Sequence, residues 1–112
     1  MISVKFEGSL LIIDQKTVSM PNEIREAFAL GDKVIVLLDP DADLGRSGQY
    51  RNLLAFDSAG TVIWQAELPT ERDSDVFTRI VSRAPLVADS FSSFECEIDP
   101  ENGRLASTRF FK

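Results

Sequence analysis

The chain has 112 residues, 44% of them apolar and 27% charged, which argues against disorder over the whole length and predicts a single domain, residues 1–112. Its 12 basic and 18 acidic residues give a net charge of −6, so we expect neither nucleic acid nor an anionic membrane as a partner, because both require clustered Lys and Arg. One cysteine and no histidine exclude an intrachain disulfide, a zinc site of the usual Cys/His type and a histidine general base.

The first twenty residues predict a meander of three short strands. Apolar and polar residues alternate over residues 2–6, an apolar run fills residues 10–13, and β-branched residues mark residues 17–20. Gly8-Ser9 and residues 14–16 are the turns between them. The start of the chain has no apolar signal core, and its apolar runs are far shorter than a membrane span, so we expect a cytoplasmic protein.

Residues 22–29 allow two interpretations. Asn22 can cap a helix, Gly31 can end it, and Ile24 and Phe28 would then share a face at i, i+4. The alternative is a turn followed by an extended strand, because so short a helix depends on tertiary packing. We therefore allow one short helical turn near 22–29 without excluding the strand.

The rest of the chain predicts strands separated by two polar loops. Residues 33–38 form an unbroken apolar run, which indicates a strand buried on both faces. Polar loops follow at 39–49 and 69–75, and further strands are expected within 50–68, at 76–80, at 85–89 and from 94 to 111. The prediction is an all-β fold, an antiparallel meander of about 8–10 short strands forming a sandwich or open barrel.

A hairpin motif occurs twice, in residues 52–64 and 94–107. Each copy is an apolar strand that ends in hydrophobe-Asp, then a tight turn with Gly, then a second strand. Asp57 and Asp99 can accept hydrogen bonds from backbone amides in the turn, and Gly60 and Gly103 can supply a positive φ. Trp64 alternates with polar neighbours in the first copy and is predicted to lie in the core.

The first hairpin, Leu54-Ala55-Phe56-Asp57 with Gly60 and Trp64, resembles a repeat of the quinoprotein-type β-propellers. A propeller contains four to eight blades of roughly 40–50 residues, so this chain holds about two and no closed ring or cofactor is implied. The order of its motifs also resembles a group of short uncharacterised bacterial proteins, which implies a small β domain of unknown function.

Two groups of carboxylates are candidate sites. Asp39, Asp41 and Asp43 have the spacing of a calcium loop, but the positions that such a loop reserves for Gly and Glu hold Leu44 and Tyr50. A solvated acidic loop is therefore the simpler interpretation, and a weak cation site is the alternative. In the second group, three carboxylates at positions 95, 97 and 99 alternate along one strand and are interpreted as its solvent face, a paired acid–base site being the alternative.

The single cysteine and the aromatic side chains are interpreted mainly as core. Cys96 lies within a strand pattern, where an isolated cysteine behaves as a small buried hydrophobe. The same holds for the aromatic residues, although some of them can line a ligand pocket or an oligomer interface. The aromatic residues concerned are Trp64, Phe77, Phe91, Phe94, Phe110 and Phe111.

No motif specifies an activity, a catalytic residue or a cofactor. We expect a small non-enzymatic module that binds a protein partner or self-associates through its terminal strand, because exposed strand edges tend to pair. Two alternatives remain. An acidic immunity-type or decoy protein would gather its carboxylates on one face to bind a basic partner. A carboxylate-dependent enzyme would need two carboxylates converging in one pocket.

Overall fold

A computed structural model describes residues 2–41 and 48–111, and within them the protein is all-β, with eleven strands and no helix. The predicted fold class is confirmed. Each of the three sheets is an antiparallel meander in which consecutive strands pair, and none closes into a barrel. In the described part of the chain there is accordingly no helix of the length and apolarity that a bilayer crossing requires.

The sheets follow one another along the chain. The first contains β1 (Val4–Glu7), β2 (Leu10–Ile13) and β3 (Lys16–Ser19). The second contains β4 (Ile24–Leu30), β5 (Lys33–Leu38), β6 (Leu53–Phe56) and β7 (Val62–Gln65). The third contains β8 (Phe77–Ser82), β9 (Val87–Ser90), β10 (Phe94–Ile98) and β11 (Leu105–Phe110).

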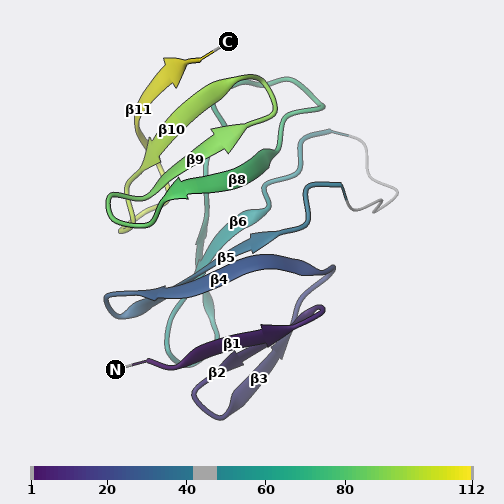
Figure 1. Ribbon diagram of the computed structural model, residues 1–112, viewed down its shortest axis with the longest axis vertical. Helices are drawn as coiled ribbons and strands as arrows, with labels where there is room; N and C mark the ends of the chain where they lie inside the picture. The colour runs from purple at the N-terminus through teal and green to yellow at the C-terminus, as the bar shows by residue number, and fades with distance from the viewer. Residues whose placement is uncertain (1, 42–47, 112) are drawn as a thin grey trace.

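The three sheets are stacked along the longest, 40 Å dimension of the molecule, with the second sheet in the middle (Figure 1). Strand β5 shows why both faces of this sheet are apolar. Val34 and Val36 pack in the core against the first sheet, whereas Ile35 and Leu37 pack in the core against the third. The unbroken apolar run of β5 is therefore buried on both sides, as its sequence predicts.

Residues 22–29 form no helical turn, because β4 begins at Ile24 and pairs with β5 over its length. Ile24 and Phe28 would share a face in a helix. In the strand they enter different cores, Ile24 toward the first sheet and Phe28 toward the third. A register shift between Ile24 and Glu26 permits this arrangement. Burial on both faces and pairing with β5 thus outweigh the weak helix signals at Asn22 and Gly31.

The repeated hairpin forms the last two strands, in chain order, of each sheet, so the first sheet contains a third copy. The sequence motif identifies β6–β7 and β10–β11, and the structure adds β2–β3. Residues 10–14 read Leu-Leu-Ile-Ile-Asp, and residues 53–57 read Leu-Leu-Ala-Phe-Asp. The first copy has a shorter turn, in which Asp14 itself takes a positive φ of 55°. The chain is therefore built from three related outer hairpins rather than two.

A buried amide joins the second and third sheets. The Asn52 side chain is fully buried, and its Nδ2 donates to the carbonyl oxygens of Leu38 at 2.9 Å and Phe77 at 2.8 Å. Its Oδ1 accepts from the Phe77 amide at 3.0 Å. One side chain thus pairs three backbone groups that would otherwise be buried without partners at the junction.

Candidate functional site

The two glycine-containing turns, β6–β7 and β10–β11, each have an Asp that accepts from the amide two residues on and a Gly with positive φ, although the second turn is one residue longer. The Asp57 carboxylate accepts from the amides of Ala59 at 2.9 Å and Thr61 at 3.0 Å, and Gly60 has a φ of 86°. In the second turn the Asp99 carboxylate accepts from the Glu101 amide at 2.9 Å, and Gly103 has a φ of 75°. These residues hold the turns together, and of them only Gly60 lines a groove.

Each of these glycines lies against a side chain of the preceding sheet. A methyl group at Gly103 would lie 2.6 Å from Cε3 of Trp64, and one at Gly60 would lie 2.8 Å from Cγ2 of Val18. Trp64 is only 7% exposed, and its Nε1 donates to the Pro100 carbonyl at 2.8 Å. At both junctions, a turn glycine of one sheet thus packs against a side chain of the preceding sheet. That side chain is Trp64 at the junction of the second and third sheets and Val18 at the junction of the first and second.

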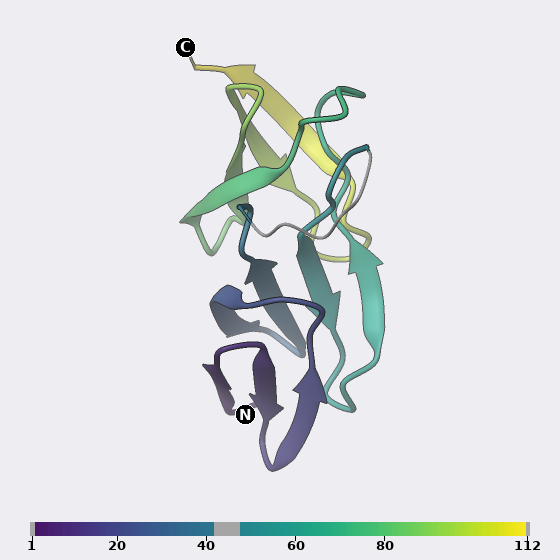
Figure 2. The ribbon, with the colours of Figure 1, turned by 90° about the vertical axis from the view of Figure 1, so that its right-hand side faces the viewer.

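A groove of about 310 Å³ opens between β3 and β7, beside Val18. Figure 2 shows these two strands, purple-blue and teal, one above the other along one side of the molecule. Apolar side chains from both sheets form most of the wall, and Ser19, Arg51 and Gln65 add polar groups. The apolar lining consists of Val18, Met20, Pro21, Leu38, Leu54, Phe56 and Val62.

A polar cleft of about 550 Å³ adjoins the groove and shares Tyr50, Arg51 and Gln65 with it. Glu71 and Asp73 from the second polar loop also line this cleft. The Arg51 side chain is exposed and forms no ion pair with any described residue. Charges of both signs therefore meet at this end of the groove.

The described part of the acidic loop after β5 is held by local interactions. Asp39 accepts from Arg25 at 2.7 Å and from the Asp41 amide at 2.9 Å, while Asp43 lies outside the described residues. Over residues 2–41 and 48–111, no three Asp, Glu or Cys side chains are grouped as metal ligands would be.

The alternating carboxylates of β10 are engaged separately. Glu95 pairs with Arg109 at 2.8 Å, Glu97 is exposed, and Asp99 belongs to the turn. A register shift between Glu97 and Ile98 also interrupts the alternation. These carboxylates do not converge as an acid–base pair requires.

Cys96 is fully buried in the core between the second and third sheets. Burial raises the pKa of its thiol to about 12, and the nearby carboxylates of Asp75, Asp89 and Glu95 add to the increase. Because the thiolate is the reactive form of cysteine, the buried thiol has the properties of a core residue, as the strand pattern predicts.

We expect Cys96 of the native protein to react with a maleimide at pH 8 at least about 100-fold more slowly than Cys96 of the denatured chain, because only about 10⁻⁴ of the buried thiol is ionised. Labelling followed by intact-mass spectrometry measures both rates. Similar rates in the two states would show that the thiol is accessible and ionised.

Strand β11 is an outer strand whose residues are exposed from Ala106 to Phe110. The Phe111 amide donates to the Ser93 carbonyl at 3.0 Å, so odd-numbered residues of β11 bond toward β10. Backbone hydrogen bonds alternate in direction along an antiparallel strand, and the amide and carbonyl groups of Thr108 and Phe110 therefore point outward.

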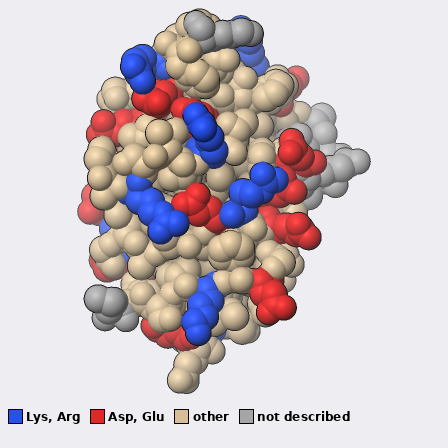
Figure 3. Space-filling view, viewed as in Figure 1, with Lys and Arg blue, Asp and Glu red and all other residues tan. Residues whose placement is uncertain are grey.

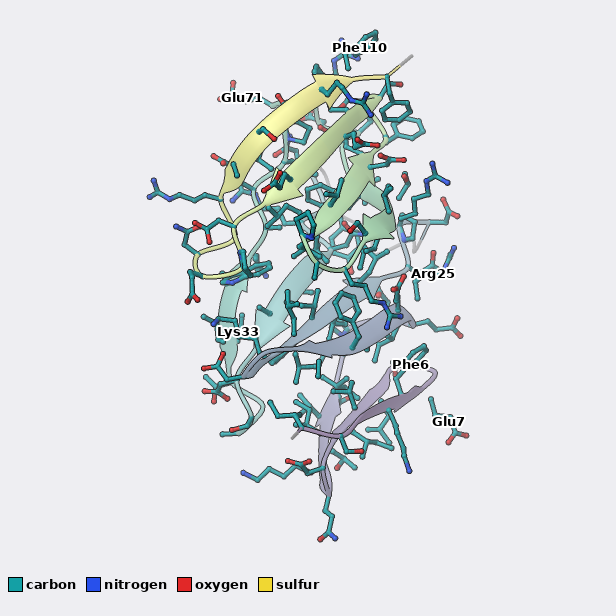
Figure 4. All side chains as sticks on the ribbon, turned by 60° about the vertical axis from the view of Figure 1, so that its left-hand side comes forward. Phe6, Glu7, Arg25, Lys33, Glu71 and Phe110 are labelled. Carbon is teal, nitrogen blue, oxygen red and sulfur yellow. The ribbon has the colours of Figure 1, made fainter. Side chains whose placement is uncertain are left out.

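Phenylalanines gather beside this edge, and three of them are more exposed than core aromatic residues would be. Phe91, Phe110 and Phe111 are 64%, 58% and 47% exposed. Phe110 packs edge-to-face on Phe94, with ring centroids 5.4 Å apart. Figure 4 shows Phe110 at the end of the molecule far from the first sheet. The core interpretation holds for Phe77, which is fully buried, but not for these three residues.

The turn that carries Phe91 is fixed by a buried carboxylate. Asp75 is 1% exposed and accepts hydrogen bonds from the hydroxyls of Thr70 at 2.6 Å and Ser92 at 3.0 Å. The Phe91 amide also donates to the Val76 carbonyl at 2.8 Å. These hydrogen bonds fix the backbone of the turn and so the position of the exposed Phe91.

Acidic and basic side chains are mixed on the face shown in Figure 3. Ion pairs also connect neighbouring strands and different sheets, for example Arg79 to Asp89 at 2.9 Å within the third sheet and Arg83 to Glu26 at 3.0 Å between the third and second sheets. This face therefore presents no surface of a single charge sign.

These observations define an all-β protein of three stacked meanders with an exposed outer strand and an apolar side groove. The chain belongs to the family described as a domain of unknown function, DUF7957, which matches residues 1–110. No curated protein and no solved structure matches the chain.

The structure adds two features that the sequence motifs did not indicate, the buried amide of Asn52 and the groove between β3 and β7, and it supplies the detail of the terminal-strand edge at β11. The second hairpin motif places a strand at β11, but its exposure depends on the strand order of the sheet. The groove lies where Val18 faces Gly60, in the position that Trp64 takes against Gly103. These contacts depend on how the sheets pack, so the sequence does not show them.

Proposed function

We propose that the protein is a non-enzymatic interaction module that self-associates by pairing β11 with β11 of a second copy. The carrying observation is the exposure of β11 from Ala106 to Phe110, with the backbone groups of Thr108 and Phe110 directed away from the sheet. Unpaired strand edges are templates for strand addition. At six residues, β11 is as long as the outer strand β8 and longer than the four-residue outer strands β1, β3 and β7, while the seven-residue β4 contacts β1 of the first sheet.

The β11 sequence supports an antiparallel pair with its two-fold axis at Thr108. There the outward amide and carbonyl of Thr108 would bond those of Thr108 in the second copy, because residues on such an axis face themselves. Ser107 would lie opposite Arg109 of the second copy. A register centred on Arg109 would instead oppose two guanidinium groups, which is unfavourable.

The exposed phenylalanines support a protein partner beside this edge. Aromatic side chains are enriched in protein interfaces, and exposed apolar patches commonly mark them. Phe110 lies on β11 itself, and Phe91 lies in the turn before β10. A contact limited to one strand and these rings is small, so a dissociation constant on the order of micromolar or weaker is expected.

The cellular setting is part of the same proposal. We place the protein in the cytoplasm, with no role for nucleic acid, membrane or cofactor. A single cysteine held as a buried thiol is compatible with a reducing compartment. The three related hairpins support a structural relation between the individual sheets of this protein and single β-propeller blades.

Thr108→Pro is expected to abolish dimer formation while preserving the fold. Proline removes the outward amide, and an edge strand tolerates it because that amide makes no bond within the sheet. Thr108→Val is the matched control, since it keeps the amide and the β-branched shape. Light scattering over micromolar to nearly millimolar protein should show wild type and Thr108→Val approaching twice the chain mass of 12.5 kDa, with Thr108→Pro remaining at 12.5 kDa.

Circular dichroism of all three proteins checks that the fold is kept. A wild-type protein that stays monomeric over the whole range would refute self-association. A Thr108→Pro dimer as stable as the wild-type dimer would place the contact on another surface.

A further inference from the structure

The groove between β3 and β7 corresponds to space that a tryptophan fills at the other junction. Trp64 covers Gly103 between the second and third sheets, and Val18 covers Gly60 between the first and second. Valine is much smaller than the indole. The groove of about 310 Å³ lies beside Val18 and Gly60, where the larger ring would be. Its position therefore matches a planar aromatic group.

The chemistry of the walls agrees with such an occupant. Buried Leu38, Leu54 and Phe56 form an apolar floor, and Val62 forms an exposed wall. Arg51 lines the groove without an ion pair to a described residue, and a guanidinium is attracted to the negative face of an aromatic ring. The chain already contains one such contact, because the Arg83 guanidinium carbon lies 4.4 Å from the centroid of the Phe28 ring.

The surrounding charges favour a neutral molecule. Arg51 would attract an anionic group, but Glu71 and Asp73 line the adjoining cleft and oppose one. The volume is at the lower end of the range for small-molecule pockets, roughly 300–1,000 Å³. We propose that this groove binds a small, neutral, planar aromatic molecule about the size of indole.

Indole itself is the probe, in an NMR titration of isotopically labelled wild-type protein. Saturable shifts are expected at the amides of Ser19 and Gln65, which line the groove. Val62→Asp should weaken binding at least about tenfold, because it places a charge against the apolar ring. Ile63→Asp is the matched control: Ile63 is the next residue, is 42% exposed against 49% for Val62, and does not line the groove.

Two further variants keep the proposal testable if Val62→Asp fails to fold. Val18→Trp should block indole by filling the groove from within, and Arg51→Gln should weaken binding about two- to fivefold. Thr108→Pro should leave indole binding unchanged, because Thr108 lies on the third sheet. The two proposals therefore succeed or fail separately.

Absence of saturable shifts up to the solubility of indole would overturn the proposal. So would equal weakening by Val62→Asp and Ile63→Asp, or shifts confined to Phe91 and Phe110. If Val18→Trp abolished the dimer while Thr108→Pro did not, the groove would be a protein contact rather than a ligand site.

Discussion

Gly103→Ala is expected to destabilise the protein by about 3–4 kcal/mol. Two costs add at this position. The residue has a φ of +75°, which strains any L side chain, and the new methyl group would lie 2.6 Å from the indole of Trp64. The indole is held by its own hydrogen bond to Pro100, so it cannot simply move away. Urea denaturation followed by circular dichroism measures the loss.

Gly31→Ala separates the two costs. Gly31 has a φ of +62° with nothing within 4 Å of the added methyl group, so alanine there should cost only the backbone strain of about 1–2 kcal/mol. The clash at Gly103 should also shrink in a Trp64→Leu background, giving a coupling energy of at least about 1 kcal/mol between the two positions. Equal losses at Gly31 and Gly103 would contradict the role given to the indole.

Asn52→Ala is expected to cost about 3–5 kcal/mol, because Asn52 is fully buried and bonds three backbone groups. The substitution leaves the carbonyls of Leu38 and Phe77 and the Phe77 amide without the partner that Asn52 supplies. These groups lie where the second and third sheets meet, so their desolvation is not recovered by solvent. Chemical denaturation measures the free energy of unfolding directly.

Asn102→Ala is the control for loss of an asparagine. Asn102 is exposed and accepts one local hydrogen bond, from the Arg104 amide at 2.9 Å, so its replacement should cost less than about 1 kcal/mol. Losses of similar size for the two variants would show that the buried amide does not hold the sheets together.

Much of the fold follows from local patterns in the sequence. The apolar run of β5 predicts a strand buried on both faces, and Asp-to-Gly turns predict the hairpins around Gly60 and Gly103. The segment at 22–29 could not be decided, because Asn22 and Gly31 signal a helix while Ile24 and Phe28 serve two different cores. The sequence predicts the β2–β3 hairpin but not its kinship with the repeat, because its turn contains no glycine.

The sequence indicates the terminal strand as an edge for pairing, but the groove and the exposed aromatic residues depend on tertiary structure. An aromatic residue is usually buried, and the sequence around Phe91 and Phe110 does not distinguish a core position from an interface position. Exposure of β11 follows from its place at the end of the strand order. The groove appears only when Val18 and Trp64 are found at equivalent junctions.

Hydrogen exchange at the Thr108 amide tests edge pairing most directly. In a monomer this amide points into solvent and should exchange nearly as fast as in an unfolded chain, whereas the Arg109 amide, bonded toward β10, should be protected. We predict that raising the protein concentration slows exchange at Thr108 and leaves Arg109 protected throughout. Fast exchange at Thr108 at every concentration would contradict pairing through β11.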